Sequence, residues 1–145
     1  MRRKLKLIFG VCVTLVLLSI PTFACTCSYD GIKAKGVSGQ VFGISHGERK
    51  PDFNQALPQA TVKLLIQTAD DQKIVAEGTA DKDGRFSLEN IKPGKYFLKI
   101  QSEGFSSVFV PIRVSKLSGK KDQIIIALAP GLQCCEGYAG VQKSR

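Results

Sequence analysis

An alternation of apolar and polar residues runs from Val37 to Ala129, and turn residues interrupt it at short intervals. One clear run has its apolar residues at Tyr96, Leu98 and Ile100. Successive side chains of a β-strand point to opposite faces, so each run has one face for a core and one for water. No segment shows a helical stripe of apolar residues. The pattern therefore predicts an all-β fold.

The turn residues divide this region into seven expected strands. These are residues 37–44, 60–68, 72–79, 85–89, 95–102, 106–115 and 122–129. Short strands at this spacing are typical of a β-sandwich or a barrel. Pro111 lies inside the sixth run, and because proline cannot donate to a strand ladder, we expect an edge position or a bulge there.

Several segments, taken in order, resemble a known family. They are Gly39-Gln40-Val41, Leu57 to Leu64, Asp81 to Leu88, Ile91 to Ile100 and Glu103-Gly104-Phe105. The order resembles the carboxypeptidase regulatory-like domain family, and the resemblance covers residues 36–129. It implies a seven-stranded, Greek-key, prealbumin-like (transthyretin-like) β-sandwich of the kind found as an accessory domain of exported and surface proteins.

The same motifs have a physical interpretation as folding signals. Gly84 and Gly94 are expected to release the chain at tight turns. Large apolar residues on adjacent strands are spaced to enter the core. They are Phe86, Leu88, Tyr96 and Leu98. This assigns the motifs a structural role rather than a catalytic one.

Residues 1–24 differ from the rest of the chain. A basic start is followed by an apolar run from Leu7 to Ile20, and the segment ends at Ala24. Fourteen residues span about 21 Å as a helix, short of a hydrocarbon core of about 30 Å. We therefore expect a secretory signal peptide and a protein that is periplasmic or secreted in a bacterium. Its removal lowers the net charge from +9 to +5, without a basic stripe, so a nucleic-acid partner is not expected.

The residue after the expected cleavage site leaves a second possibility open. Cys25 could take a lipid, as in bacterial lipoproteins, and hold the protein on a membrane. The resemblance to a lipoprotein signal is partial, since Thr22 and Phe23 stand where such signals carry Leu and a small residue. Release is the first hypothesis, and membrane association is expected only if Cys25 is lipidated.

Four cysteines follow the signal, namely Cys25, Cys27, Cys134 and Cys135. An even number in an exported protein predicts disulfides. Sequence neighbours lie about 3.8 Å apart at Cα, too close for an ordinary disulfide, so we expect pairings that tie the N-terminal segment to the C-terminal one. The alternative is a thiol-based site for Zn²⁺ or Cu(I), or a redox protein, but the gaps between these cysteines are shorter than in structural zinc sites. We predict no metal and no cofactor.

The inventory of residues argues against an enzyme. His46 is the sole histidine and lies in a polar stretch, so we expect a surface position rather than a catalytic one. One histidine cannot supply the two His ligands of zinc peptidases or of the iron dioxygenases built on related sandwiches. The last strand offers no Asn or Asp for an isopeptide bond to Lys, and the C-terminus lacks the motif of hydroxyisourate hydrolases.

These inferences give a domain plan and a function. Residues 1–24 form the signal peptide, 25–36 and 130–145 the Cys-bearing ends, and 37–129 the sandwich. We expect a non-enzymatic binding or structural module of the bacterial envelope, with a protein or glycan partner that the sequence does not identify and an oligomeric state that it leaves open. The segment from Gly47 to Pro58 is the longest break in the strand pattern, and such loops often bind. Its candidate binding residues are Arg49, Lys50, Asp52, Phe53 and Asn54.

Overall fold

The computed structural model describes residues 27–44, 55–68, 71–116, 120–131 and 137–143. These residues form ten strands and two sheets. The strands are β1 (Cys27–Ser28), β2 (Ile32–Lys35), β3 (Val37–Gly43), β4 (Thr61–Gln67), β5 (Gln72–Thr79), β6 (Arg85–Leu88), β7 (Gly94–Gln101), β8 (Val108–Ser115), β9 (Gln123–Leu128) and β10 (Tyr138–Gln142). The prediction of an all-β sandwich is confirmed.

The seven expected strands correspond to β3 through β9. Three further strands, β1, β2 and β10, lie in the segments that flank the expected sandwich, and each pairs with a strand of it. The expected signal peptide, residues 1–24, lies outside the described residues.

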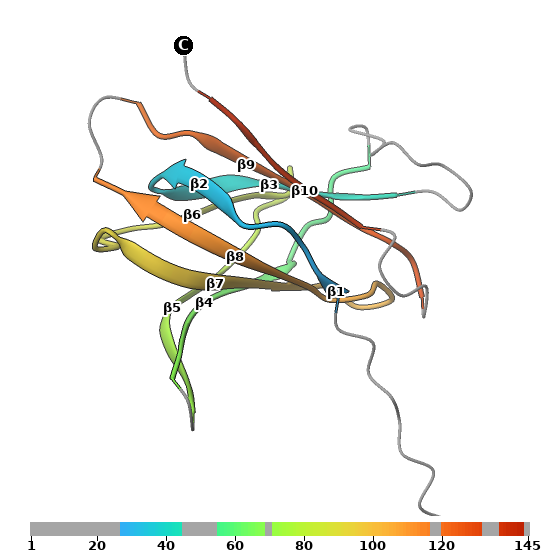
Figure 1. The fold of residues 1–145 in the computed structure, drawn as a ribbon. Coiled ribbons are helices and arrows are strands. Elements are labelled where there is room, and N and C mark those ends of the chain that lie inside the picture. The colour runs from blue at the N-terminus through green and yellow to red at the C-terminus, as the bar shows by residue number, and fades with distance from the viewer. Residues whose placement is uncertain (1–26, 45–54, 69–70, 117–119, 132–136, 144–145) are drawn as a thin grey trace, which may run out of the picture.

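The two sheets pack face to face (Figure 1). In sheet A, β1 and β2 both pair with β8, which is followed by β7, β4 and β5. Sheet B has the order β10-β9-β3-β6. Strands β3 and β9 are parallel, and they are far apart in the sequence.

The core lies between the sheets, as the period-two pattern predicts. The four residues Phe86, Leu88, Tyr96 and Leu98 are all buried. The largest fully buried side chains come from both sheets and are all aliphatic. They are Leu64, Leu98, Ile100, Ile124, Ile126, Leu128, Val37, Val41, Val62, Val108 and Val110. Burial of this apolar surface is the main stabilising term of the sandwich.

Pro111 lies in the interior of β8, which pairs on both sides. Strand β7 pairs with it on one side, where Pro111 is opposite Phe97. On the other side, β1 pairs with residues Val108 and Phe109, and β2 pairs from Ile112 onwards. The parallel pairing is thus interrupted at the one residue of β8 that has no N–H group. In place of the expected edge position or bulge, the structure has a gap between β1 and β2 at Pro111, while the pairing with β7 is continuous.

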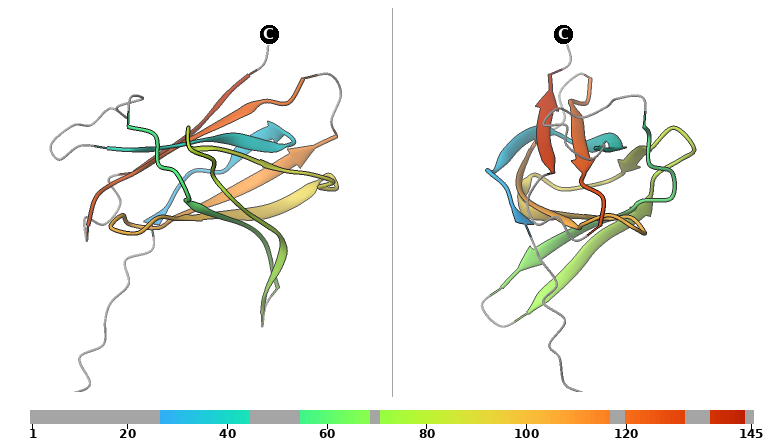
Figure 2. Two further views of the ribbon diagram at one scale, coloured as in Figure 1. Left: turned by 180° about the vertical axis from the view of Figure 1, so that it is seen from behind. Right: turned by 90° about the vertical axis from the view of Figure 1, so that its right-hand side faces the viewer.

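The hairpin of β4 and β5 extends beyond the body of the sandwich (Figures 1 and 2). The register between the two strands shifts at Leu64 and Leu65. Ile66, which the alternation places on the core face, is 39% exposed because it lies beyond this shift, on the projecting part of the hairpin. The alternation of β4 therefore continues to Ile66, although the core between the sheets ends before that residue.

The two glycines of the turn motifs have different roles. Gly84 has φ of +72°, as a tight turn requires, and donates to the carbonyl of Asp81 at 3.0 Å. Gly94 does not have a positive φ and is the first residue of β7. In the turn between β6 and β7, the left-handed residue is Asn90, with φ of 59°. A side chain at Gly94 would crowd the ring of Tyr96, whose hydroxyl donates to Lys92 O at 2.8 Å. The prediction of a turn role for Gly94 is therefore wrong.

Candidate functional site

Most of the residues that stand out in the sequence lie outside the described part of the chain. This holds for His46, for the five loop residues Arg49, Lys50, Asp52, Phe53 and Asn54, and for three of the four cysteines. Cys27 is placed through its backbone in β1. The described ends of the loop meet, because Gly43 N donates to Gln55 O at 2.8 Å.

A continuous apolar row crosses the outer face of sheet A. The strand registers place Leu65 opposite Ile74 on one side and opposite Phe97 on the other, and Phe97 opposite Pro111. We call Ile74, Leu65, Phe97 and Pro111 the apolar row. Leu65 is buried by its neighbours, Phe97 and Pro111 are half-buried, and Ile74 is 47% exposed. Apolar residues aligned over four strands on an outer face form a hydrophobic patch, and such patches often mark interaction sites.

Phe109 extends the apolar row along β8. Its ring stacks on that of Phe97, with centroids 4.8 Å apart and planes 12° from parallel. The two residues are diagonal neighbours on adjacent strands, a distance that aromatic rings can bridge. The stacked rings add an aromatic pair to the apolar row.

A row of positive charges runs parallel to the apolar row. Lys95 of β7 lies opposite Arg113 of β8, which lies opposite Lys33 of β2. We call these three the cationic row. All three are exposed, and none of them forms an ion pair with another described residue. Like charges directly opposite each other destabilise a sheet, so this arrangement lowers the stability of the free protein.

The two rows are two residues apart along the strands, which corresponds to about 6.6 Å. A hollow of about 500 Å³ lies over the cationic row and over Phe97 and Pro111 of the apolar row, and Ile32, Ile66 and Gln67 also line it. An anionic group over the cationic row would remove the repulsion between its members, while an apolar group next to it would cover the rings. The surface thus fits a ligand that carries both.

The sequence contains a signal for this surface. Phe97, Phe109 and Pro111 stand at positions that the alternation assigns to the solvent face. Apolar residues at such positions in neighbouring strands are a sign of a binding face. The strand registers were needed to show that these residues meet.

The edge where β9 begins has a structural role. Asp122 is 6% exposed and accepts a hydrogen bond from Lys35 N at 2.9 Å, while its own N–H donates to Lys35 O. Next to it, Lys121 pairs with Glu89 at 2.7 Å. Hydrogen bonds from Lys121 and Ser87 to Glu89, with the charge of Lys121, lower the pKa of Glu89. Glu89 is exposed and Lys121 only half-buried, so we assign this pair a small part in stability.

Among the described residues, no group of three His, Cys, Asp or Glu side chains is placed to hold a metal ion. They also include no helix with the length and apolar character needed to cross a bilayer.

Comparison with known proteins places the fold in a family. The family described as the second beta sandwich domain of BOS complex subunit NOMO1-like proteins matches residues 36–125. That range begins just before β3 and ends within β9. A comparison with curated proteins gave no match.

Proposed function

Because this chain belongs to the family of the NOMO1-like second beta sandwich domain, a β-sandwich family related to the prealbumin-like fold, we propose that it is a non-enzymatic module that binds an acidic polypeptide through the outer face of sheet A. The observation that carries the proposal is the cationic row beside the apolar row. The family description names a subunit of a complex, and a module that contacts another chain agrees with it.

The carboxypeptidase regulatory-like resemblance supports the same role, since such domains accompany other parts of exported and surface proteins. We place the protein in the bacterial envelope after removal of residues 1–24, either periplasmic or secreted. A lipid on Cys25, with membrane anchoring, is the alternative for its location. A thiol-based metal-handling or redox role is the alternative for its function.

The spacing of the two rows defines the ligand. Side chains on one face of an extended peptide repeat about every 6.8 Å, close to the distance between the rows. A segment lying along β7 and β8 could place a carboxylate over Arg113 and an apolar side chain over the stacked rings. Arg is well suited to this task because its planar guanidinium binds both oxygens of a carboxylate.

The test uses three synthetic peptides of equal length that repeat Glu-Ser-Phe-Ser, Gln-Ser-Phe-Ser or Lys-Ser-Phe-Ser. We expect the Glu peptide to bind most tightly, the Lys peptide not to bind, and the affinity of the Glu peptide to fall with added salt. Arg113→Gln should weaken binding of the Glu peptide by about tenfold or more, because it removes a charge-assisted hydrogen bond. Fluorescence anisotropy of labelled peptides measures the dissociation constants.

The control is Lys82→Gln, which removes an exposed charge from the turn before β6, away from both rows. It should bind the Glu peptide like the unmodified protein. Arg113→Gln should also keep or raise the urea midpoint, because it relieves repulsion with Lys95 and Lys33. Equal affinity for the three peptides, or equal loss in both variants, would refute the proposed surface.

Export and the cysteines are tested separately by intact mass under non-reducing conditions. The protein is purified from cells that export it, and we expect cleavage before Cys25 and a mass four hydrogens below that of the reduced chain. Tyr29 and Gly137 support pairing of the two ends, because a side chain at Gly137 would collide with the hydroxyl of Tyr29. An added lipid mass would establish anchoring through Cys25, and four free thiols that zinc protects would establish the metal alternative.

A further inference from the structure

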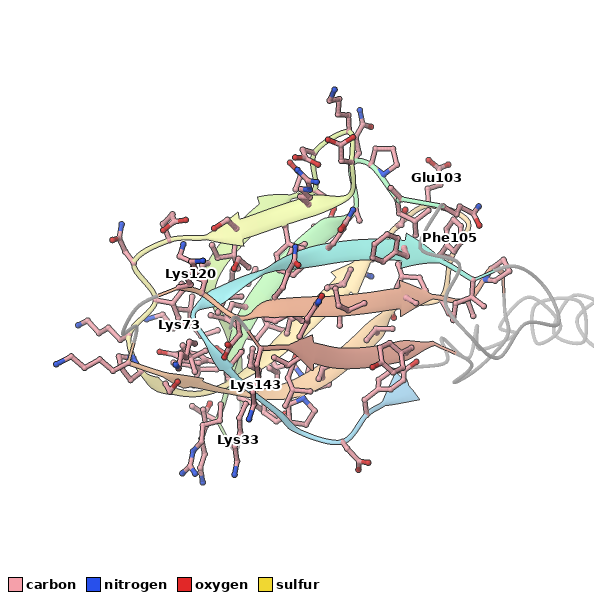
Figure 3. All side chains as sticks on the ribbon, turned by 90° about the horizontal axis from the view of Figure 1, so that it is seen from above. Lys33, Lys73, Glu103, Phe105, Lys120 and Lys143 are labelled. Atoms are coloured by element: carbon pink, nitrogen blue, oxygen red, sulfur yellow. The ribbon has the colours of Figure 1, made fainter. Side chains whose placement is uncertain are left out.

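A second hollow lies on the opposite side of the molecule, over the outer face of sheet B, which faces the viewer in Figure 3. Its volume is about 660 Å³. It is lined by Gln40, Phe42, Gln123, Ile125, Tyr138, Val141 and Gln142. None of these residues carries a charge. This separates the hollow from the cationic row of sheet A and calls for a ligand that is polar but neutral.

Tyr138 presents its ring on this face. The residue is 46% exposed, the highest value but one among the large apolar and aromatic side chains that are exposed in the described residues. A Cβ added at Gly140 would lie 2.7 Å from Cζ and 3.0 Å from Cε1 of Tyr138. The ring therefore lies along β10, directly over Gly140, and glycine is what leaves room for it. One side of the ring rests on the backbone, and the other is available to a ligand.

Three amide side chains line the same hollow as the ring. The register places Gln123 opposite Gln142, and Gln40 lies opposite Ile125 in the neighbouring ladder. The Nε2 of Gln40 donates to Asp83 O at 2.7 Å, which fixes that amide and leaves its oxygen as an acceptor. An amide has both a donor and an acceptor, so it can pair with the hydroxyl groups of a sugar. An aromatic ring can pack against the C–H face of a pyranose.

From this placement we propose that the outer face of sheet B is a binding site for a neutral glycan chain, with Tyr138 as the stacking platform and Gln40, Gln123 and Gln142 as hydrogen-bonding groups. The site shares no residue with the peptide-binding surface of sheet A. Its failure and the failure of that proposal are therefore distinguishable.

The test uses cellohexaose, maltohexaose and chitohexaose as probes. Binding is followed by NMR shifts of the Gln side-chain amides and of the Tyr138 ring as each sugar is added to the full-length protein. We expect at least one hexaose to give saturable shifts at these residues, with an affinity that does not change with salt, because no ion pair forms. Absence of such shifts with all three sugars would overturn the proposal.

Variants test the role of the ring. Tyr138→Ala should weaken binding by about tenfold, while Tyr138→Phe, which keeps the ring, should retain most of it. Gly140→Ala is the sharper variant, because its new Cβ must displace the ring without removing it, and the ring can move into solvent. It should weaken binding nearly as much as Tyr138→Ala. Unchanged affinity in both Tyr138→Ala and Gly140→Ala would overturn the stacking role.

Gln142→Ala should also weaken binding, and Gln72→Ala is its matched control, since Gln72 is an exposed glutamine at the start of β5 in the other sheet. A urea titration of each variant establishes that the fold is intact. The Glu-Ser-Phe-Ser peptide should bind Tyr138→Ala as it binds the unmodified protein. Loss of both ligands in a Tyr138→Ala variant whose urea midpoint is unchanged would refute a separate site.

Discussion

Replacing Gly39 with Ala is expected to lower the free energy of unfolding by about 3 kcal/mol or more, which is a large part of the stability of a domain this size. Gly39 lies in the middle of β3, between Phe86 of β6 and Ile124 of β9. A Cβ at this position would overlap the carbonyl oxygen of Ile124 and lie 2.8 Å from its carbonyl carbon. The obstacle is backbone, so no rotamer change removes it.

The consequence reaches both neighbours of β3. Ile124 belongs to the parallel pair of β3 and β9, and it is fully buried. Making room for a methyl group requires β9 to move away from β3, which opens that ladder and the packing of Ile124 and Ile126 together. Equilibrium unfolding in urea, followed by far-ultraviolet circular dichroism, measures the effect as a lower midpoint.

Gly31→Ala is the control for the alanine itself. Gly31 is exposed, and its added Cβ would meet only Pro111 O at 3.5 Å and Pro111 Cβ at 3.7 Å, which are ordinary contacts. Its midpoint should stay close to that of the unmodified protein. If Gly39→Ala unfolded at the same urea concentration as Gly31→Ala, the close approach of β3 and β9 would be refuted.

The fold was predictable because one physical rule governs most of it. A strand with one buried face must alternate, and the seven runs from residue 37 to residue 129 became β3 to β9. The alternation failed at Ile66 because the β4–β5 hairpin projects beyond the core, so an apolar residue there meets solvent. Strand β1 was missed because it has only two residues. Strands β2 and β10 were missed because they have a single buried residue between them, so their sequences show no clear alternation.

The candidate site was much less predictable. Lys95, Arg113 and Lys33 belong to three strands, and nothing in the linear sequence places them opposite one another. In the sequence, charged residues at alternate positions of a strand indicate only a solvent-exposed face. The strand register is needed to show that these three lie opposite one another. Tyr138 was hidden for a similar reason, because its role depends on Gly140 and on amides from β3 and β9. The loop residues 49–54, which the sequence favoured, lie outside the described residues, so that prediction stands untested.

Gly84 was identified from sequence as a turn glycine, and its replacement is the second large effect that we expect. Gly84→Ala should lower the free energy of unfolding by about 2 to 4 kcal/mol, from two sources. The first is φ of +72°, which costs a residue with a Cβ about 1 to 2 kcal/mol. The second is a contact of 2.5 Å between the new Cβ and Val41 O.

The second source is large because Gly84 lies where three segments meet. Its carbonyl accepts from Val41 N at 2.8 Å, and Val41 O in turn accepts from Leu57 N at 3.0 Å. A methyl group that pushes Val41 away therefore disturbs the turn before β6, the middle of β3 and the segment that leads into β4. Neither hydrogen bond can be kept at its present length.

Gly104→Ala separates the two sources. Gly104 has φ of +79°, close to that of Gly84, but no atom lies within 4 Å of its added Cβ. It should lose only the backbone contribution, about 1 to 2 kcal/mol. The difference between the two urea-derived free energies then measures the contact with Val41 alone. Equal losses at the two glycines would mean that Gly84 serves only the turn, and that the junction of β3, β6 and the segment before β4 tolerates a side chain there.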